Sequence, residues 1–188
     1  YRWIFPRLSI TGWRVTDRSD KNLLMKHELF RHLELEFFVP RRHVEDAAAL
    51  VREIVDLFAG TTKAISDDTR QRLEQHGLLD SLRQKRGTFT QHYVICVRKI
   101  LPDDTLLSMA SSDGEPWYSF SLITYVEPRE PFYAMAELLA HCAVALYGGR
   151  LHWGKWFPLR HDEIEATPFD YPSIWRVLNR LDGEAPSA

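Results

Sequence analysis

An abrupt switch of hydrophobic periodicity constrains the fold of this chain more than any other feature. In Leu33–Val39 apolar residues occupy every second position, with Glu34 and Glu36 between them. This alternation predicts a strand with one buried face. Pro40 ends the strand, because proline cannot donate a hydrogen bond to a neighbouring strand. Residues 41–59 then place their apolar side chains at helical spacing, which predicts an amphipathic helix that covers the buried face.

Further strands and helices follow along the 188 residues. Phe89–Leu101 and Trp117–Val126 are rich in β-branched and aromatic residues and are predicted strands, with a shorter one at 106–109. Glu130–Tyr147 is a predicted amphipathic helix, and Ser173–Leu181 a shorter one. Strands joined by short turns imply antiparallel pairing. The predicted fold class is therefore α+β, a multi-stranded antiparallel sheet flanked by helices.

Composition excludes several classes of partner. The formal net charge of −2 provides no basic surface for nucleic acid or for an acidic membrane. No stretch approaches the roughly 18 apolar residues of a membrane span. Cys96 and Cys142 both lie within apolar runs, which favours free thiols in a reducing compartment and hence a cytoplasmic location.

The most unusual local sequence follows the Gly148-Gly149 pair. There Lys155 lies close to two tryptophans, Trp153 and Trp156. A lysine held between indoles loses solvent, and a fixed cation of this kind can stabilise negative charge that develops during a reaction. The alternative is that the aromatic residues belong to the core and that Lys155 extends to solvent.

Arg98 is the second candidate site residue. It shares a predicted strand face with Cys96 and Ile100, where a charged side chain needs a partner or a ligand. A structural ion pair with Glu34 or Glu36 on another strand is an equally good interpretation.

His152-Trp153-Gly154-Lys155, taken with the stretch Glu34–Pro40, resembles the C-terminal signature of the aldonolactone and alditol oxidase group. These flavoproteins belong to the vanillyl-alcohol oxidase superfamily. The resemblance implies that residues 31–182 are the cap, or substrate, domain of an FAD-linked oxidoreductase, with 66–86 as a helical insertion. By the same resemblance, residues 1–30 connect it to a FAD-binding domain of the same protein that is absent from this chain, and 183–188 form a tail.

The resemblance also implies roles for residues near the cofactor. In such enzymes the lysine of this motif lies at the flavin ring and favours the anionic reduced form of the flavin. The resemblance gives this role to Lys155, and His152 and Trp153 would shape the wall around the ring. Arg98 corresponds to the arginine of a Glu-x-Arg pair that contacts substrate hydroxyls. Cys96 replaces the glutamate of that pair, which puts the usual substrate class in doubt.

A third family motif is matched only in part. Thr124 matches the threonine of a His-x-Thr sequence that lines the substrate pocket, and Leu122 replaces the histidine. This substitution implies a less polar pocket, with Arg98 and Thr124 on the sheet face that meets the substrate.

The implied function is oxidation of a hydroxyl-bearing carbon in a small molecule, such as a sugar lactone, an alditol or a related alcohol, with hydride transfer to FAD. The chain alone is expected to be inactive. One alternative is a stand-alone α+β ligand-binding or dimerisation module that uses the Trp153–Trp156 region as an apolar patch. Another is an enzyme that depends on Cys96 or on a metal. The candidate metal ligands lack a recognisable spacing; they are His27 with His32, or His152 with His161, Asp162 and Glu163.

Overall fold

The computed structural model describes residues 31–105, 107–160 and 164. The chain divides into two units, Tyr1–Arg31 and His32–Ala188, and the described elements all belong to the second. The expected N-terminal connection, the helix at 173–181 and the tail at 183–188 lie outside the described residues. The elements in chain order are β1 (His32–Pro40), η1 (Arg41–His43), α3 (Val44–Ala59), α4 (Asp67–Gln75), η2 (Leu79–Leu82), β2 (Cys96–Ile100), β3 (Trp117–Tyr125), α5 (Arg129–Tyr147) and β4 (Arg150–Leu151).

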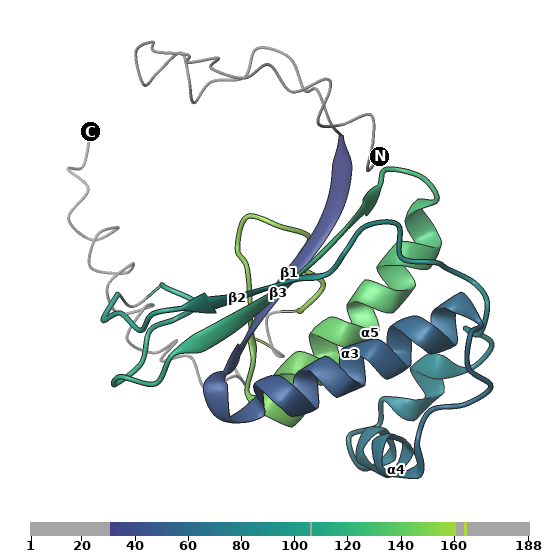
Figure 1. Ribbon diagram of the computed structural model, residues 1–188, viewed down its shortest axis with the longest axis horizontal. Helices are drawn as coiled ribbons and strands as arrows, with labels where there is room; N and C mark the ends of the chain where they lie inside the picture. The colour runs from purple at the N-terminus through teal and green to yellow at the C-terminus, as the bar shows by residue number, and fades with distance from the viewer. Residues whose placement is uncertain (1–30, 106, 161–163, 165–188) are drawn as a thin grey trace, which may run out of the picture. The chain divides into compact units, whose positions relative to one another are not determined.

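The four described strands form one antiparallel sheet in the order β2-β3-β1-β4. β1 and β3 pair along their whole length, from His32 opposite Tyr125 to Pro40 opposite Trp117. Helices α3 and α5 lie together on one face of this sheet (Figure 1). The predicted α+β class, with an antiparallel sheet flanked by helices, is confirmed.

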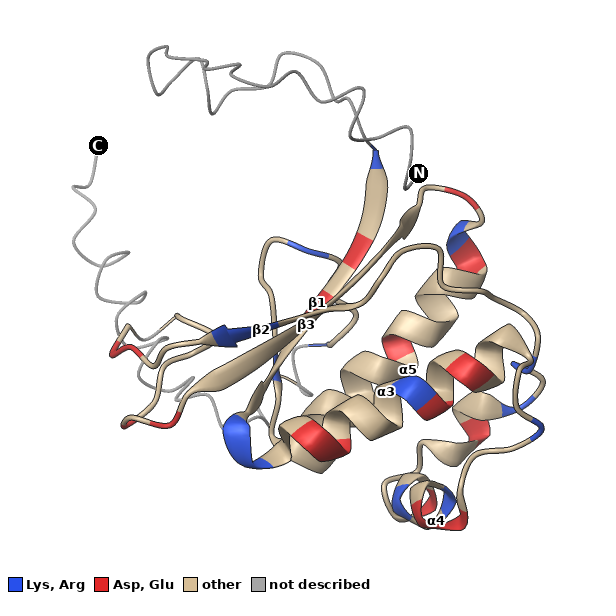
Figure 2. Ribbon diagram, viewed as in Figure 1, with Lys and Arg blue, Asp and Glu red and all other residues tan. Residues whose placement is uncertain are grey.

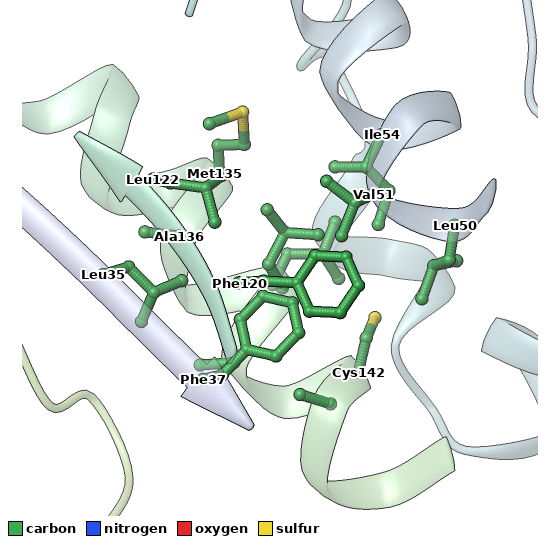
Figure 3. Close-up of a cluster of buried hydrophobic side chains, with 14 of the residues drawn as sticks. Leu35, Phe37, Leu50, Val51, Ile54, Phe120, Leu122, Met135, Ala136 and Cys142 are labelled. Atoms are coloured by element: carbon green, nitrogen blue, oxygen red, sulfur yellow. The ribbon is translucent and has the colours of Figure 1, made fainter. Parts of the chain in front are cut away.

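The core lies between that face and the two helices. Phe37 of β1 lies opposite Phe120 of β3, and their rings stack with centroids 5.1 Å apart. Leu35 and Leu122 form the next pair on the same face of the sheet, and both are fully buried. Side chains of α3 and α5, such as Met135, close over these residues (Figure 3). The alternation seen in the sequence thus places the apolar half of β1 in the core.

Both long helices occur where periodicity predicts them, with a small shift at one end. Arg41–His43 form a 3-10 turn, so α3 begins after that turn. The segment at 66–86 contains α4 and the short η2, and the Ser66 hydroxyl accepts a hydrogen bond from the Thr69 N–H at 3.2 Å at the start of α4.

The connection from α5 to β4 depends on two glycines. Gly148 ends α5 with φ of 58°, in the left-handed region that favours glycine. A Cβ at Gly149 would lie 2.7 Å from the carbonyl oxygen of Ala143 and 2.8 Å from that of Phe38. Only glycine lets the chain pass this closely between helix and strand to enter β4.

Two predicted strands are wrong in whole or in part. Of Phe89–Leu101, only Cys96–Ile100 pairs with a neighbouring strand. Phe89 instead enters the core under the helices, and its backbone N–H donates to the carbonyl of Phe58 at 3.1 Å. Phe89 is buried and Tyr93 and Ile95 are partly buried without strand pairing, whereas Val94 is exposed. Of the short strand expected at 106–109, the described residues 107–109 form no strand, and Leu107, Met109 and Ala110 lie in turns.

Phe37→Ala is expected to lower the free energy of unfolding by about 3–5 kcal/mol, because it leaves a cavity beside the stacked Phe120 ring. Val94→Ala is the control, since Val94 is 81% exposed and its truncation should change stability by less than about 0.5 kcal/mol. Urea denaturation followed by circular dichroism measures both. Equal effects of the two changes would contradict this account of the core.

Candidate functional site

The face of the sheet that α3 and α5 do not cover carries the polar residues. Register places Cys96, Ser121 and Glu36 in one row across β2, β3 and β1, and Arg98 and Ser119 in the next row. We call this surface the polar face; it comprises Cys96, Arg98, Ser119, Ser121, Glu34 and Glu36. Acidic residues on β1 and basic residues on β2 flank the central β3 (Figure 2).

Arg98 reaches across β3 to a glutamate. Its guanidinium lies 3.6 Å from a carboxylate oxygen of Glu36, whose side chain is only 10% exposed. The small side chains of Ser119 and Ser121 between them leave room for this approach. The alternative interpretation of Arg98 as an ion-pair partner of a β1 glutamate is therefore confirmed.

Lys155 is held by a carboxylate. Its ammonium donates to Glu34 Oε2 at 2.6 Å, and the Ser121 hydroxyl donates to Glu34 Oε1 at 2.7 Å. The loop that carries Lys155 follows β1 through its backbone, because His152 N–H donates to Glu36 O at 2.9 Å and Trp156 N–H to Glu34 O at 3.2 Å. These bonds fix the lysine over the polar face.

The partner of the Lys155 ammonium is the Glu34 carboxylate, whereas the two indoles expected to hold it each stack on another ring. Trp153 stacks on Phe157 with ring centroids 5.2 Å apart, and Trp156 stacks on Tyr133 at 4.6 Å. The Lys155 side chain is 31% exposed, and its ammonium forms an ion pair with Glu34.

Burial and hydrogen bonding act on Glu34 in opposite directions. Partial burial raises the pKa of its carboxyl, but hydrogen bonds from Lys155 and Ser121 and the positive charge of Lys155 lower it by more. The net pKa lies below the ordinary glutamate value, so Glu34 is ionised at neutral pH.

His152 lies beside the second glutamate. Its Nε2 is 4.0 Å from Glu36 Oε2, and its Nδ1 accepts a hydrogen bond from the Gly154 N–H at 3.0 Å. A Cβ at Gly154 would lie 3.3 Å from His152 Cε1, which is tighter than ordinary packing. Glycine at this position lets the backbone N–H approach the ring.

The loop between β2 and β3 folds over one end of the polar face. Phe38, Ala110 and Trp117 form a small buried cluster there, separate from the main core. Arg150 anchors the loop: its guanidinium lies over the Trp117 ring at 4.2 Å and donates to the carbonyl of Ser111 at 2.7 Å. Burial lowers the pKa of Arg150 from its ordinary value, while the charge of Asp103 opposes that shift.

The two loops are joined to each other. Trp153 Nε1 donates to the carbonyl of Leu107 at 3.0 Å. The polar face is thus bordered by the β2–β3 loop and by residues 152–157, with Glu34 and Glu36 at its floor.

Leu122 and Thr124 do not belong to this site. Leu122 is fully buried in the core, and Thr124 contacts His92 Nδ1 through its hydroxyl at 2.5 Å on the helix-covered side. The expectation that Arg98 and Thr124 share a sheet face is wrong, because side chains of a strand alternate between faces. The β3 residues that share the face of Arg98 are Ser119 and Ser121.

Sequence reasoning missed the serines and Arg150. Ser121 lies between the apolar residues Phe120 and Leu122. This alternation of polar and apolar residues could have indicated that Ser121 lies on the sheet face opposite the core. Nothing local in the sequence indicates that Arg150 is buried.

The structure offers little support for the two alternatives of an enzyme that depends on Cys96 or on a metal ion. Cys96 and Cys142 are free thiols, and burial raises the pKa of Cys142 to about 12. His92 lies outside strand β2 and contacts Thr124. Among the described residues no group of three or more histidine, cysteine, aspartate or glutamate side chains is arranged to hold a metal ion. His27 and residues 161–163 lie outside those described.

Comparison with known proteins relates this chain to an oxidase. It is 40% identical over 184 residues to a protein named long-chain alcohol oxidase from an uncultured marine euryarchaeote. The match covers 97% of this chain but 38% of the relative, so the chain spans less than half of that protein's length. No family model matches the chain. The similarity supports an oxidase family.

The lengths and hydropathies of the helices bear on whether any of them could span a membrane. Within the part of the chain that the structure describes, none is both long enough and apolar enough to cross a bilayer.

Lys155→Met is expected to lower the free energy of unfolding by about 1–2 kcal/mol at neutral pH, because Glu34 is left partly buried without its cation. The pKa of Glu34 is lowered in the folded state, so the pair stabilises the fold above the unfolded pKa of about 4.3 and loses this effect as pH falls through the folded pKa. The difference between the two proteins should therefore shrink below about pH 4.

Chemical denaturation at a series of pH values measures this difference. Lys63→Met, at an exposed position, is the matched control and should leave stability nearly unchanged at every pH. A deficit of Lys155→Met that persists undiminished in acid argues against the pairing with Glu34.

Proposed function

We propose that this chain is the substrate-binding cap domain of a FAD-dependent oxidoreductase that oxidises a hydroxyl-bearing carbon. The polar face meets the substrate and the flavin ring. FAD is bound mainly by another domain of the same protein, which this chain does not contain.

The observation that carries the proposal is the pair of cations on one sheet face. Arg98 and Lys155 come from segments far apart in the sequence, and each is paired with a glutamate of β1. Their side chains remain 54% and 31% exposed, so both can still contact a ligand. A flavin ring that gains negative charge on reduction, and a substrate oxygen, are groups that such cations stabilise. The residues therefore fit the implied cofactor.

Oxidation of an alcohol removes a hydride from carbon and a proton from oxygen. The bound flavin supplies the hydride acceptor. Within this chain, Arg98 orients the substrate oxygen, and Lys155 maintains a positive charge close to the ring. Glu34 holds the ammonium of Lys155 in place through a 2.6 Å hydrogen bond, and the two loops that border the polar face limit access of water.

The relative named long-chain alcohol oxidase supports this assignment, since its match covers nearly the whole of this chain. We propose an alcohol as substrate, with long-chain alcohols favoured over sugar lactones and alditols. Cys96 in place of an acidic residue agrees with a substrate that has few hydroxyls.

We propose the cytoplasm as location, in agreement with the two free thiols, and no nucleic-acid partner.

The full-length protein is expected to show the visible absorption of a bound flavin, whereas the 188-residue chain alone should show none and be inactive. Lys155→Met in the full-length protein should slow reduction of the flavin by a primary alcohol about 100-fold, by loss of one charge-stabilising donor. Anaerobic stopped-flow absorbance measures the rate, and Lys63→Met should react like the unmodified protein. A full-length protein without flavin absorbance disproves the proposed function.

A further inference from the structure

The hydrogen bonding of His152 fixes which of its ring nitrogens carries a proton. The backbone N–H of Gly154 donates to Nδ1 at 3.0 Å, so Nδ1 must present a lone pair. In neutral imidazole the other nitrogen is then protonated. His152 therefore directs an Nε2–H donor toward Glu36, whose Oε2 lies 4.0 Å away.

The two glutamates of the polar face differ in their free hydrogen-bonding capacity. Both carboxylate oxygens of Glu34 accept short hydrogen bonds, from Lys155 at 2.6 Å and from Ser121 at 2.7 Å. The charged partners of Glu36 lie farther off, with Arg98 at 3.6 Å and His152 at 4.0 Å, and both separations exceed a hydrogen bond. Glu36 therefore retains acceptor capacity that Glu34 has used.

The Nε2–H donor of His152 and the Oε2 acceptor of Glu36 lie 4.0 Å apart, and this separation suits a hydroxyl group bound between them. A hydroxyl oxygen placed about 2.8 Å from each accepts from Nε2–H and donates to the carboxylate, with an angle of roughly 90° at the oxygen. A hydroxyl both donates and accepts. An ether oxygen can only accept, so it can bond to the Nε2–H of His152 but cannot donate to Glu36.

We propose that His152 and Glu36 bind the reacting hydroxyl of the substrate and that Glu36 accepts its proton. This inference rests on the proposed function and adds the site of proton transfer. A flavin bound by the other domain would accept the hydride that is released when the carbon–hydrogen bond breaks. The oxygen–hydrogen bond breaks with the proton passing to Glu36, and the carbon–oxygen double bond forms. Arg98 keeps the carboxylate in position for this transfer.

The first test is a binding measurement that involves no turnover. The full-length protein is reduced beforehand under anaerobic conditions, and octanol and octyl methyl ether are titrated by calorimetry. We expect octanol to bind more tightly than the ether. Glu36→Gln replaces the charged acceptor by a neutral one and should reduce this preference about tenfold. Glu74→Gln, on the exposed surface of α4, is the matched control and should retain the preference.

His152→Phe separates the two halves of the site. The ring centroids of His152 and Phe38 lie 6.2 Å apart. The phenylalanine keeps an aromatic ring next to Phe38 but removes the Nε2–H donor. Octanol and the ether should then lose affinity by the same factor, because both accept from Nε2–H. If Glu36→Gln does not fold, this variant still decides the proposal, since unchanged affinities for both ligands overturn it.

The tautomer is tested by nitrogen-15 NMR of protein with labelled histidine, with the His152 signals identified by their loss in His152→Phe. An unprotonated Nδ1 and a protonated Nε2 are expected at neutral pH. A protonated Nδ1, or an alcohol preference that survives in Glu36→Gln, overturns the proposal. Either result alongside normal flavin absorbance refutes this inference alone, whereas missing flavin absorbance refutes the proposed function.

Discussion

The two-sided character of β1 is the constraint on which the rest of the structure depends. Leu35 and Phe37 must face the helices to build the core, and strand geometry then places Glu34 and Glu36 on the opposite side. Carboxylates with side chains only 10% exposed require partners. Arg98 and Lys155 satisfy that requirement, so burial of apolar residues on one face determines where charge gathers on the other.

Much of the architecture could be predicted from the sequence because burial leaves a periodic signal. β1, β3, α3 and α5 are long elements whose apolar residues repeat at the strand or helix period. The antiparallel sheet followed from strands that succeed one another along the chain. The strand predicted at 89–101 failed in its first half because apolar composition reports burial and does not distinguish pairing from packing under a helix.

The candidate site was predictable only in part. Lys155, Arg98 and the β1 glutamates were visible as charged residues in otherwise apolar or aromatic surroundings. The pairing of Lys155 with Glu34 could not be predicted, because the two residues are 121 positions apart and only the folded structure brings them together. Thr124 was assigned to the site from a motif, and one residue of displacement along a strand is enough to reverse the face. Sites built from several strands depend on register, which short motifs do not encode.

Arg150 contacts the β2–β3 loop through main-chain carbonyls and stacks on Trp117, at the start of β3. Carbonyl groups are the same in every amino acid, so these hydrogen bonds do not depend on the side chains of Ser108, Met109 and Ser111, whose carbonyls accept them. Substitutions along the tip of the loop can therefore alter the border of the polar face without releasing the loop from the sheet. The arrangement separates the part of the protein that must stay fixed from a part whose chemistry is free to diverge among relatives.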